Sequence, residues 1–151
     1  WPARIKPGRV SDDLLCQTDV LATLAGIVGA RLPGHAGEDS ISFLDVLEGR
    51  PRRGAVRRDI IYHSGNGKYA IRQGNWVLML DGDGGGNARP EPDWFRKQRG
   101  IEPSSAPHEL FDLGRDPGQT TNLFEANPAK VRELRELFER QKRSGRSAPP
   151  R

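Results

Sequence analysis

Residues 60–80 read IIYHSGNGKYAIRQGNWVLML, and this stretch decides the fold of the chain. IIYHS and KYAIRQ are β-rich runs separated by a short Gly-Asn-Gly connection, and Gln73, Gly74 and Asn75 then lead into WVLML. Asn-Gly pairs favour hairpin turns because both residues tolerate positive φ. The stretch therefore predicts three antiparallel strands joined by short turns.

The letters GNGKYA at residues 65–70 also satisfy G-x-G-x-x-G/A, a pattern found in dinucleotide-binding turns. Such a turn must open a helix whose N-terminus faces the pyrophosphate. Here the pattern runs into YAIRQ and is interrupted at Gly74, which is typical of a strand and its turn. We therefore interpret residues 65–70 as a hairpin and not as a nucleotide site.

Beyond residue 107, HELFDL predicts a fourth strand and residues 127–143 predict a helix. Asn127 and Pro128 fit the first positions of that helix. Four apolar side chains then recur at helical spacing along one face, namely Val131, Leu134, Leu137 and Phe138. The expected fold is α+β, a four-stranded antiparallel sheet packed by a C-terminal helix, with residues 144–151 loose.

Residues 81–107 contain so much Gly, Pro and charge that no packed helix or strand is predicted there. Loops of this length tend to be functional or disordered. Trp94 and Phe95 leave two interpretations open. The loop lies on an apolar surface, or it is a flexible insertion with one hydrophobic anchor.

The first 58 residues carry two shorter helical patterns. QTDVLATLAGIVG, residues 17–29, begins with Thr18 as the expected N-cap. Its apolar side is formed by positions at helical spacing that include Val20, Leu24 and Val28. ISFLDVLEG predicts a second helical turn that stops at Gly49, before an arginine-rich loop.

The chain has 24 Lys and Arg against 20 Asp and Glu, a net charge of +4. The cations gather at the C-terminal end and in the arginine-rich loop without an aromatic-interleaved motif, so we expect solvated surface and no nucleic-acid partner. No apolar run approaches the roughly 20 residues that span a bilayer, so no membrane partner is expected. The single cysteine, Cys16, excludes an internal disulfide.

The sequence offers no catalytic residue and no metal site of its own. His63 and Ser64 are adjacent, and neighbours on a strand point to opposite faces, so they do not form a catalytic dyad. The three histidines are too widely separated in the sequence for a metal-binding motif. Asp81 and Asp83 resemble the start of a calcium loop, but the position that should hold its later Glu is Pro92. We therefore expect no cofactor in this chain.

Five separated stretches, in the same order, resemble the C-terminal third of a sulfatase of the arylsulfatase type. WPARIKPGRVSD resembles W-P-G-x-I-x-P-G, QTDVLATLAGIVG resembles D-L-x-P-T-L-x-x-x-A-G, and GEDSISFLDVLEGR resembles D-G-x-S-L-x-P-L-L-x-G. HSGNGKYAIRQGNWVLML resembles A-I-R-x-G-x-W-K-L, and HELFDLGRDPGQTTNLFEANPAKVRELRE resembles E-L-Y-D-L-x-x-D-P-x-E-x-x-N-L-A-x-x-x-P-x-x-V-x-x-L. Ala3, Ala22 and Val77 depart from the usual Gly, Pro and Lys, none of which is catalytic in that family.

The resemblance implies that residues 1–58 are the closing segment and linker of an incomplete alkaline-phosphatase-like α/β domain, and that residues 59–151 are the C-terminal subdomain. The apolar side of residues 17–29 would then pack on the rest of that domain. Sulfatases of this type use formylglycine, made from Cys or Ser in C-x-P-S-R or S-x-P-S-R, together with calcium. Those residues lie upstream in the family, and Cys16 is followed by QTDV, so this chain alone is expected to be inactive.

In proteins that resemble this one, the end of the first hairpin approaches the substrate cleft. His63, Asn66 and Lys68 are therefore our substrate-cleft candidates, although a purely turn-making role stays open. The complete enzyme would hydrolyse the sulfate ester of a sulfated small molecule or sugar, and the family places such enzymes in the periplasm or outside the cell. The alternative is a stand-alone binding module for an anionic sugar or protein, built on the basic C-terminal helix with Trp94 and Phe95.

Overall fold

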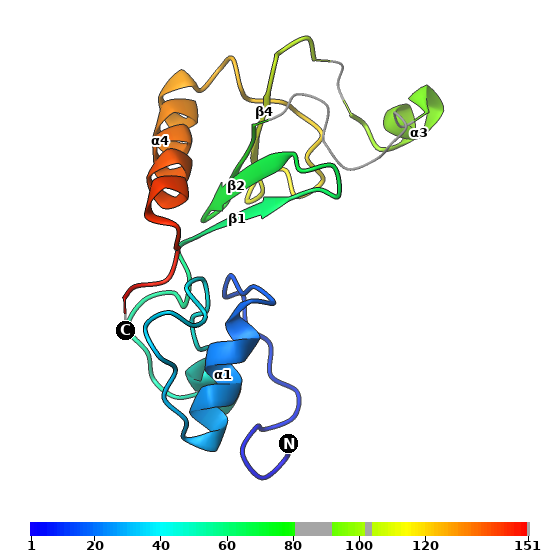
Figure 1. Cartoon of the computed structure of the whole chain (residues 1–151). Coiled ribbons are helices and arrows are strands. Elements are labelled where there is room, and N and C mark those ends of the chain that lie inside the picture. The colour runs from blue at the N-terminus through cyan, green and yellow to red at the C-terminus, as the bar shows by residue number, and fades with distance from the viewer. Residues whose placement is uncertain (81–91, 102–103, 151) are drawn as a thin grey trace. The chain divides into compact units, whose positions relative to one another are not determined.

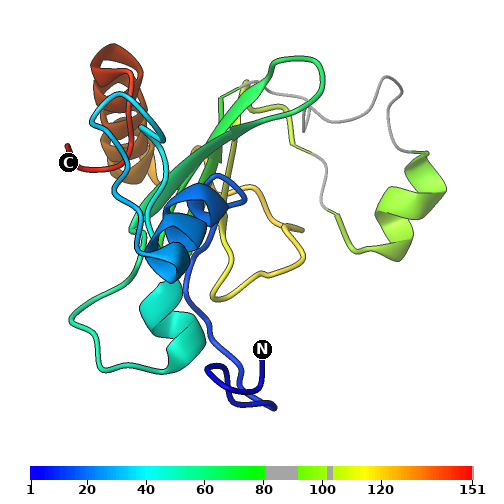
Figure 2. The ribbon, with the colours of Figure 1, turned by 60° about the horizontal axis from the view of Figure 1, so that its bottom comes forward.

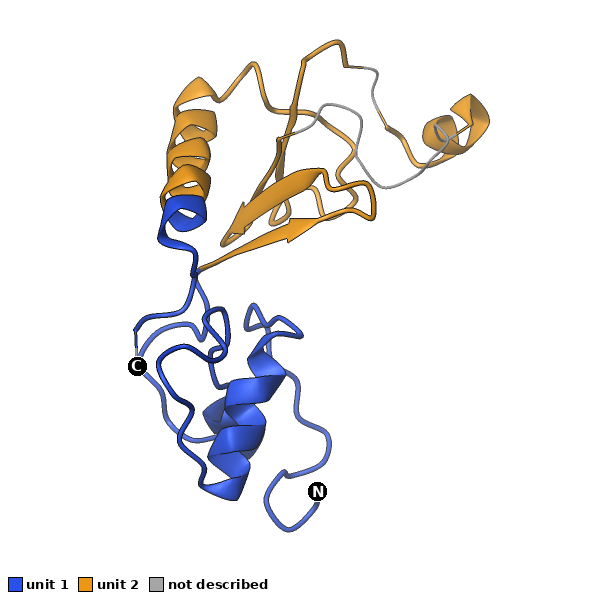
Figure 3. Ribbon diagram, viewed as in Figure 1, with its two compact units in different colours: residues 1–58, 141–151 blue, residues 59–140 orange. Residues whose placement is uncertain are grey.

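The computed structural model describes residues 1–80, 92–101 and 104–150 (Figure 1). The chain forms two compact units, which Figure 3 colours separately. The first unit consists of residues 1–58 and 141–151, and the second of residues 59–140. The chain therefore returns to the first unit after it has completed the second.

The second unit is built on a four-stranded antiparallel sheet in the order β1-β2-β3-β4 (Figure 1). The strands are β1 Asp59–His63, β2 Tyr69–Gln73, β3 Trp76–Met79 and β4 Glu109–Asp112. The register places one apolar residue of each strand opposite the next. This row consists of Ile61, Ile71, Leu78 and Leu110. The predicted three-strand meander and its fourth strand are confirmed.

The two turns of the meander use glycine, and not asparagine, for the left-handed backbone. Of the three loop residues Gly65, Asn66 and Gly67, Gly67 alone has positive φ, 75°, as in a three-residue hairpin loop that ends in a left-handed residue. Between β2 and β3, Gly74 has φ 57° and Asn75 has no positive φ, as in a turn with Gly at its first central position. The neighbouring glycines adopt positive φ without a Cβ clash, so neither asparagine has to take it.

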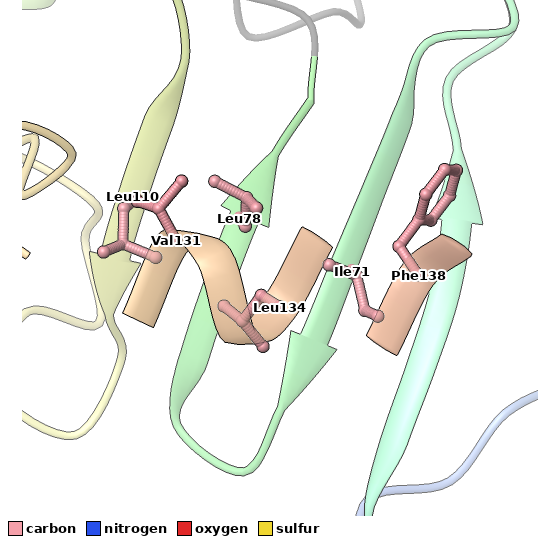
Figure 4. Packing of buried hydrophobic residues seen from close by; sticks show 6 residues of the cluster. All are labelled: Ile71, Leu78, Leu110, Val131, Leu134 and Phe138. Carbon is pink, nitrogen blue, oxygen red and sulfur yellow. The ribbon is translucent and has the colours of Figure 1, made fainter. Parts of the chain in front are cut away.

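Helix α4, Pro128–Ser144, covers one face of this sheet (Figures 1 and 2). Six buried side chains form the core between helix and sheet, namely Ile71, Leu78, Leu110, Val131, Leu134 and Phe138 (Figure 4). Leu137 packs against this cluster. Because fully burying one such side chain contributes about 1.5–3 kcal/mol, the cluster is the main source of stability in the second unit. The apolar face predicted for this helix is confirmed.

Between β3 and β4 lies a short helix, α3 Asp93–Gln98, in a stretch for which the composition predicts no element. Asp93 in its first turn and cations in its last turn both suit the helix dipole, so local propensity outweighs the flanking Gly and Pro residues. Trp94 is 67% exposed, so the described residues do not show it lying on an apolar surface. Asp81 and Asp83, the considered calcium-loop residues, lie outside the described ranges.

The first unit contains helices α1 Asp19–Val28 and α2 Leu44–Glu48. Both end as predicted at a glycine with left-handed φ, Gly29 and Gly49. Thr18 occupies the expected N-cap position of α1 but makes no capping hydrogen bond with its side chain. Its hydroxyl donates instead to the Asp39 carbonyl oxygen at 3.4 Å, so tertiary contact replaces the expected local cap.

Asp19 is fully buried in the first unit, and its carboxylate is saturated with hydrogen bonds. It accepts from the backbone N–H groups of Cys16 and Ile41, each at 2.9 Å, and from Nη2 of Arg57 at 2.5 Å. Arg57 is only 4% exposed and also donates to the Asp39 carbonyl oxygen. Burial by itself raises the pKa of Asp19. The Arg57 guanidinium and the two N–H groups lower it by more, so the pKa of Asp19 lies below its usual value.

The C-terminal tail is not loose, contrary to the sequence prediction. Ser147 donates from its backbone N–H and from its hydroxyl to Oδ1 of Asp39, at 2.7 and 2.8 Å. Ala148 is buried, and its N–H donates to the Glu38 carbonyl oxygen at 3.0 Å. No local pattern predicts these contacts, because Asp39 lies 108 residues before Ser147.

Candidate functional site

The substrate-cleft candidates lie in the connection between β1 and β2, which hydrogen bonds hold in one shape. The Ser64 N–H donates to the Lys68 carbonyl oxygen, and the Gly67 N–H donates to the Ser64 carbonyl oxygen, both at 2.9 Å. The Ser64 hydroxyl accepts from the Lys68 N–H at 3.3 Å. Ser64 therefore serves the turn with both its backbone and its hydroxyl.

His63 is exposed at the end of β1, next to this loop. Its Nδ1 lies 2.9 Å from the Ser64 carbonyl oxygen. Because a carbonyl oxygen only accepts, Nδ1 carries a proton and donates it in this contact. The orientation of the imidazole is thus fixed by its own loop.

Asn66 and Lys68 complete the set of candidates on the same hairpin end. Asn66 is exposed within the loop, and Lys68 is half-buried directly before β2. This hairpin end thus carries an imidazole, an amide and an ammonium group, types of group that can bind anionic and hydroxyl groups. Their contact with a substrate stays a prediction.

Tyr69 is a further aromatic residue at this end of the sheet, and the sequence analysis missed it. Its ring lies 5.8 Å from the His63 ring and 5.6 Å from the Phe138 ring, measured between centroids. The ring of Tyr69 therefore links the hairpin end to α4. The alternation of side chains along the two strands could have indicated this contact, because His63 and Tyr69 are paired residues that share one face of the sheet.

Tyr62 precedes His63 and lies on the other face of β1. Burial raises the pKa of the Tyr62 phenol, and the nearby Arg72 opposes this effect. The phenol therefore stays protonated at neutral pH and keeps both a donor and an acceptor.

The polar residues of the stretch after β4 are used in backbone contacts. Oδ1 of Asn122 accepts from two backbone N–H groups, each at 3.0 Å. The Asp116 carboxylate accepts from the N–H groups of Thr120 and Thr121 at 2.7 and 2.9 Å. Burial raises the pKa of Asp116, but these N–H groups lower it below its usual value. The side chains of Asn122 and Asp116 thus shape this loop.

Within residues 1–80, 92–101 and 104–150, no group of three or more His, Cys, Asp or Glu side chains is arranged to hold a metal ion. No helix in these ranges is both long and apolar enough to cross a membrane. Cys16 is a half-buried free thiol before α1.

No protein-family model matches the chain. An N-acetylgalactosamine-6-O-sulfatase of Bacteroides thetaiotaomicron is 32% identical to it, over 92% of this chain and 25% of the relative. Arylsulfatase A of Homo sapiens is 27% identical, over 91% of this chain and 28% of the relative. An ulvan-active sulfatase of Formosa agariphila is 28% identical, over 96% of this chain and 32% of the relative.

Solved structures agree with these matches. One, from work on the metabolism of multiple glycosaminoglycans by Bacteroides thetaiotaomicron, aligns with a TM-score of 0.70 and 30% identity over 94% of this chain and 28% of that chain. Another, in complex with its substrate D-glucosamine-2-N,6-O-disulfate, has a TM-score of 0.57 at 23% identity and supports the fold alone. This chain spans about a quarter of the length of the curated relatives it matches. The resemblance found in the five sequence stretches is confirmed.

Proposed function

Because this chain is a partial sulfatase region, we propose that it completes the structure of a longer sulfatase that hydrolyses a sulfate ester. In this proposal residues 1–58 close an α/β domain and residues 59–151 form the C-terminal subdomain. The described residues do not fit calcium or formylglycine, since they contain no metal-binding cluster and Cys16 does not begin C-x-P-S-R. No step of the hydrolysis is therefore assigned to this chain.

The observation that carries the proposal is the uncovered apolar side of α1. Its side chains are between 43% and 75% exposed, namely Val20, Leu21, Leu24 and Val28. At about 25 cal/mol per Å², covering about 300 Å² of such surface contributes about 7.5 kcal/mol. A longer sulfatase provides chain to cover it, since this chain matches only 25% of the N-acetylgalactosamine-6-O-sulfatase.

Within that enzyme we infer that the end of the β1–β2 hairpin forms part of the substrate cleft wall. Lys68 supplies a charged donor, His63 a polar ring and Asn66 a neutral donor and acceptor. The relatives act, by their names, on N-acetylgalactosamine-6-O-sulfate and on ulvan, which supports a sulfated carbohydrate as the substrate class. These side chains would bind and orient the substrate without acting in the chemical step.

The experiment is a chimaera in which this chain replaces the matched region of the Bacteroides thetaiotaomicron N-acetylgalactosamine-6-O-sulfatase. We expect the chimaera to hydrolyse its sulfated sugar, and this chain by itself to leave an aryl sulfate intact. In the chimaera, His63→Ala and Lys68→Ala should each raise KM or change substrate preference while kcat is retained. The expected loss in kcat/KM corresponds to one charge-assisted hydrogen bond, about 1.5–3 kcal/mol.

Arg132→Ala is the control, because Arg132 is an exposed cation on α4, outside the hairpin. Its kinetics should equal those of the unmodified chimaera. Unchanged kinetics for both hairpin variants would assign His63 and Lys68 to turn-making alone. Hydrolysis by this chain alone would contradict the proposal, and a folded but inactive chimaera would favour a stand-alone binding module.

A further inference from the structure

Helix α3 presents two aromatic side chains to solvent. Trp94 is 67% exposed and Phe95 is 37% exposed. Their ring centroids lie 5.6 Å apart at an interplanar angle of 67°, and the Arg99 guanidinium lies 5.7 Å from the Phe95 centroid. Phe95 thus lies next to both the Trp94 indole and the Arg99 guanidinium, while most of the indole stays exposed.

The same helix is basic. Asp93 is its single acidic residue, and Arg96 and Lys97 lie in its last turn. Residues three apart share one side of a helix, so Lys97 lies on the side that carries Trp94. An exposed aromatic ring with an ammonium group beside it suits a ligand that has an apolar face and an anionic substituent close together.

We propose that α3 is a binding surface for sulfated carbohydrate, separate from the hairpin candidates. The C–H groups on one face of a pyranose ring would pack on Trp94, while Lys97 donates to the oxygens of a sulfate on that sugar. A sulfated sugar meets both demands because the sulfate ester is attached directly to the ring. The inference rests on the proposed function, which makes sulfated carbohydrate the substrate class, and it adds a second contact with the same polymer.

The arrangement of α3 favours this ligand over two other anionic partners. Helices that lie on membranes carry their apolar residues on one face and their cations on the other. In α3 each ring shares its side with a cation, Trp94 with Lys97 and Phe95 with Arg99. Single-stranded nucleic acid requires a longer basic groove that follows its backbone, whereas α3 has 6 residues.

The test is calorimetric titration of this chain with chondroitin sulfate and with chemically desulfated chondroitin. We expect binding to the sulfated polymer and much weaker binding to the desulfated one. Trp94→Ala and Lys97→Ala should each weaken binding roughly tenfold, the effect of losing one stacked ring or one charge-assisted hydrogen bond. Trp94 and Lys97 are both exposed, so circular dichroism of these variants should be unchanged.

Trp1→Ala and Lys6→Ala are the matched controls, because they remove the same residue types from exposed positions in the first unit. They should change binding less than about twofold, as surface changes away from the site do. Equal losses for the α3 pair and the control pair would overturn the inference, as would equal binding of desulfated chondroitin or of vesicles rich in phosphatidylserine. So would the absence of any binding by the unmodified chain.

The titration involves no turnover, so it separates failure of this inference from failure of the proposed function. Loss of binding in the Trp94 and Lys97 variants together with an inactive chimaera would retain the α3 surface and reject the sulfatase role. An active chimaera made from a chain that does not bind sulfated polymer would retain the sulfatase role and reject the α3 surface.

Discussion

The two units of this chain bury opposite kinds of residue. The core of the second unit is entirely apolar and lies between the sheet and α4 (Figure 4). In the first unit the buried polar residues are Asp19, Thr23, Ser40 and Arg57, and the buried apolar residues among those described are two alanines, Ala25 and Ala148. Four of the five large apolar side chains of α1 are exposed instead, namely Val20, Leu21, Leu24 and Val28, and Ile27 is half-buried.

This difference shows that different interactions stabilise the two units. Removal of apolar surface from water stabilises the second unit. The first unit depends on the Asp19–Arg57 ion pair, and a buried ion pair adds little net stability although breaking it costs much. Such a network selects one arrangement of the chain, while four apolar side chains of α1 remain exposed.

The largest effect should follow from removing one partner of the buried ion pair. Asp19→Ala leaves the Arg57 guanidinium buried without its carboxylate, so the first unit should lose about 3–5 kcal/mol. Hydrogen exchange of the α1 amides measures this loss separately from the second unit. Asp13→Ala is the control, since the Asp13–Arg52 pair is more exposed and should cost less than about 1 kcal/mol. Equal losses of stability in Asp19→Ala and Asp13→Ala would mean that the first unit does not depend specially on its buried ion pair.

A leucine in each unit provides the next comparison. Leu134 is 0% exposed in the core and Leu24 is 54% exposed on α1. Leu134→Ala should destabilise the second unit by about 3 kcal/mol, because it leaves a cavity. Leu24→Ala should change stability by less than about 0.5 kcal/mol in denaturant unfolding. A large effect at Leu24 would mean that the apolar side of α1 is already covered in solution, for instance by a second copy.

Acid should affect the first unit through Asp19. Its pKa is lowered by folding, so its contribution to stability is full above the ordinary carboxyl value of 3.8 and is lost as the pH falls through the lower folded value. We expect Asp19→Asn to remove much of the acid dependence of α1 protection in hydrogen exchange. Asp116→Asn, at a carboxylate whose pKa is also lowered but in the second unit, should leave that dependence intact. An unchanged acid profile in Asp19→Asn would contradict this account.

The smallest expected effect concerns the C-terminal tail. Ser147→Ala removes the hydroxyl that donates to Asp39 and accepts from Arg57, so the first unit should lose about 1 kcal/mol. Ser105→Ala, at an exposed serine of the second unit, is the control and should be neutral within about 0.5 kcal/mol. If thermal unfolding shows no difference between these variants, the tail does not stabilise the first unit.

Part of the candidate site could be predicted from the sequence because its residues are local. His63, Asn66 and Lys68 lie within six consecutive residues at one hairpin end, whatever packs around it, and the glycines of that loop signal the turn. The contact of Tyr69 with Phe138 depends instead on how α4 crosses the sheet. The sequence predicted both elements but not the pairing of these two rings.

By itself, the sequence determined the strands, their antiparallel order and the apolar face of α4, because alternation and helical spacing act over a few residues. It also determined the relation to sulfatases, through five short stretches in order. Tertiary structure alone decided that Arg57 reaches Asp19 across 38 residues and that Ser147 reaches Asp39 across 108. Such polar pairs have no periodic signature in the sequence. Any of several carboxylates can accept hydrogen bonds from one guanidinium, and only the packed structure, which excludes water from one pair, selects the partner.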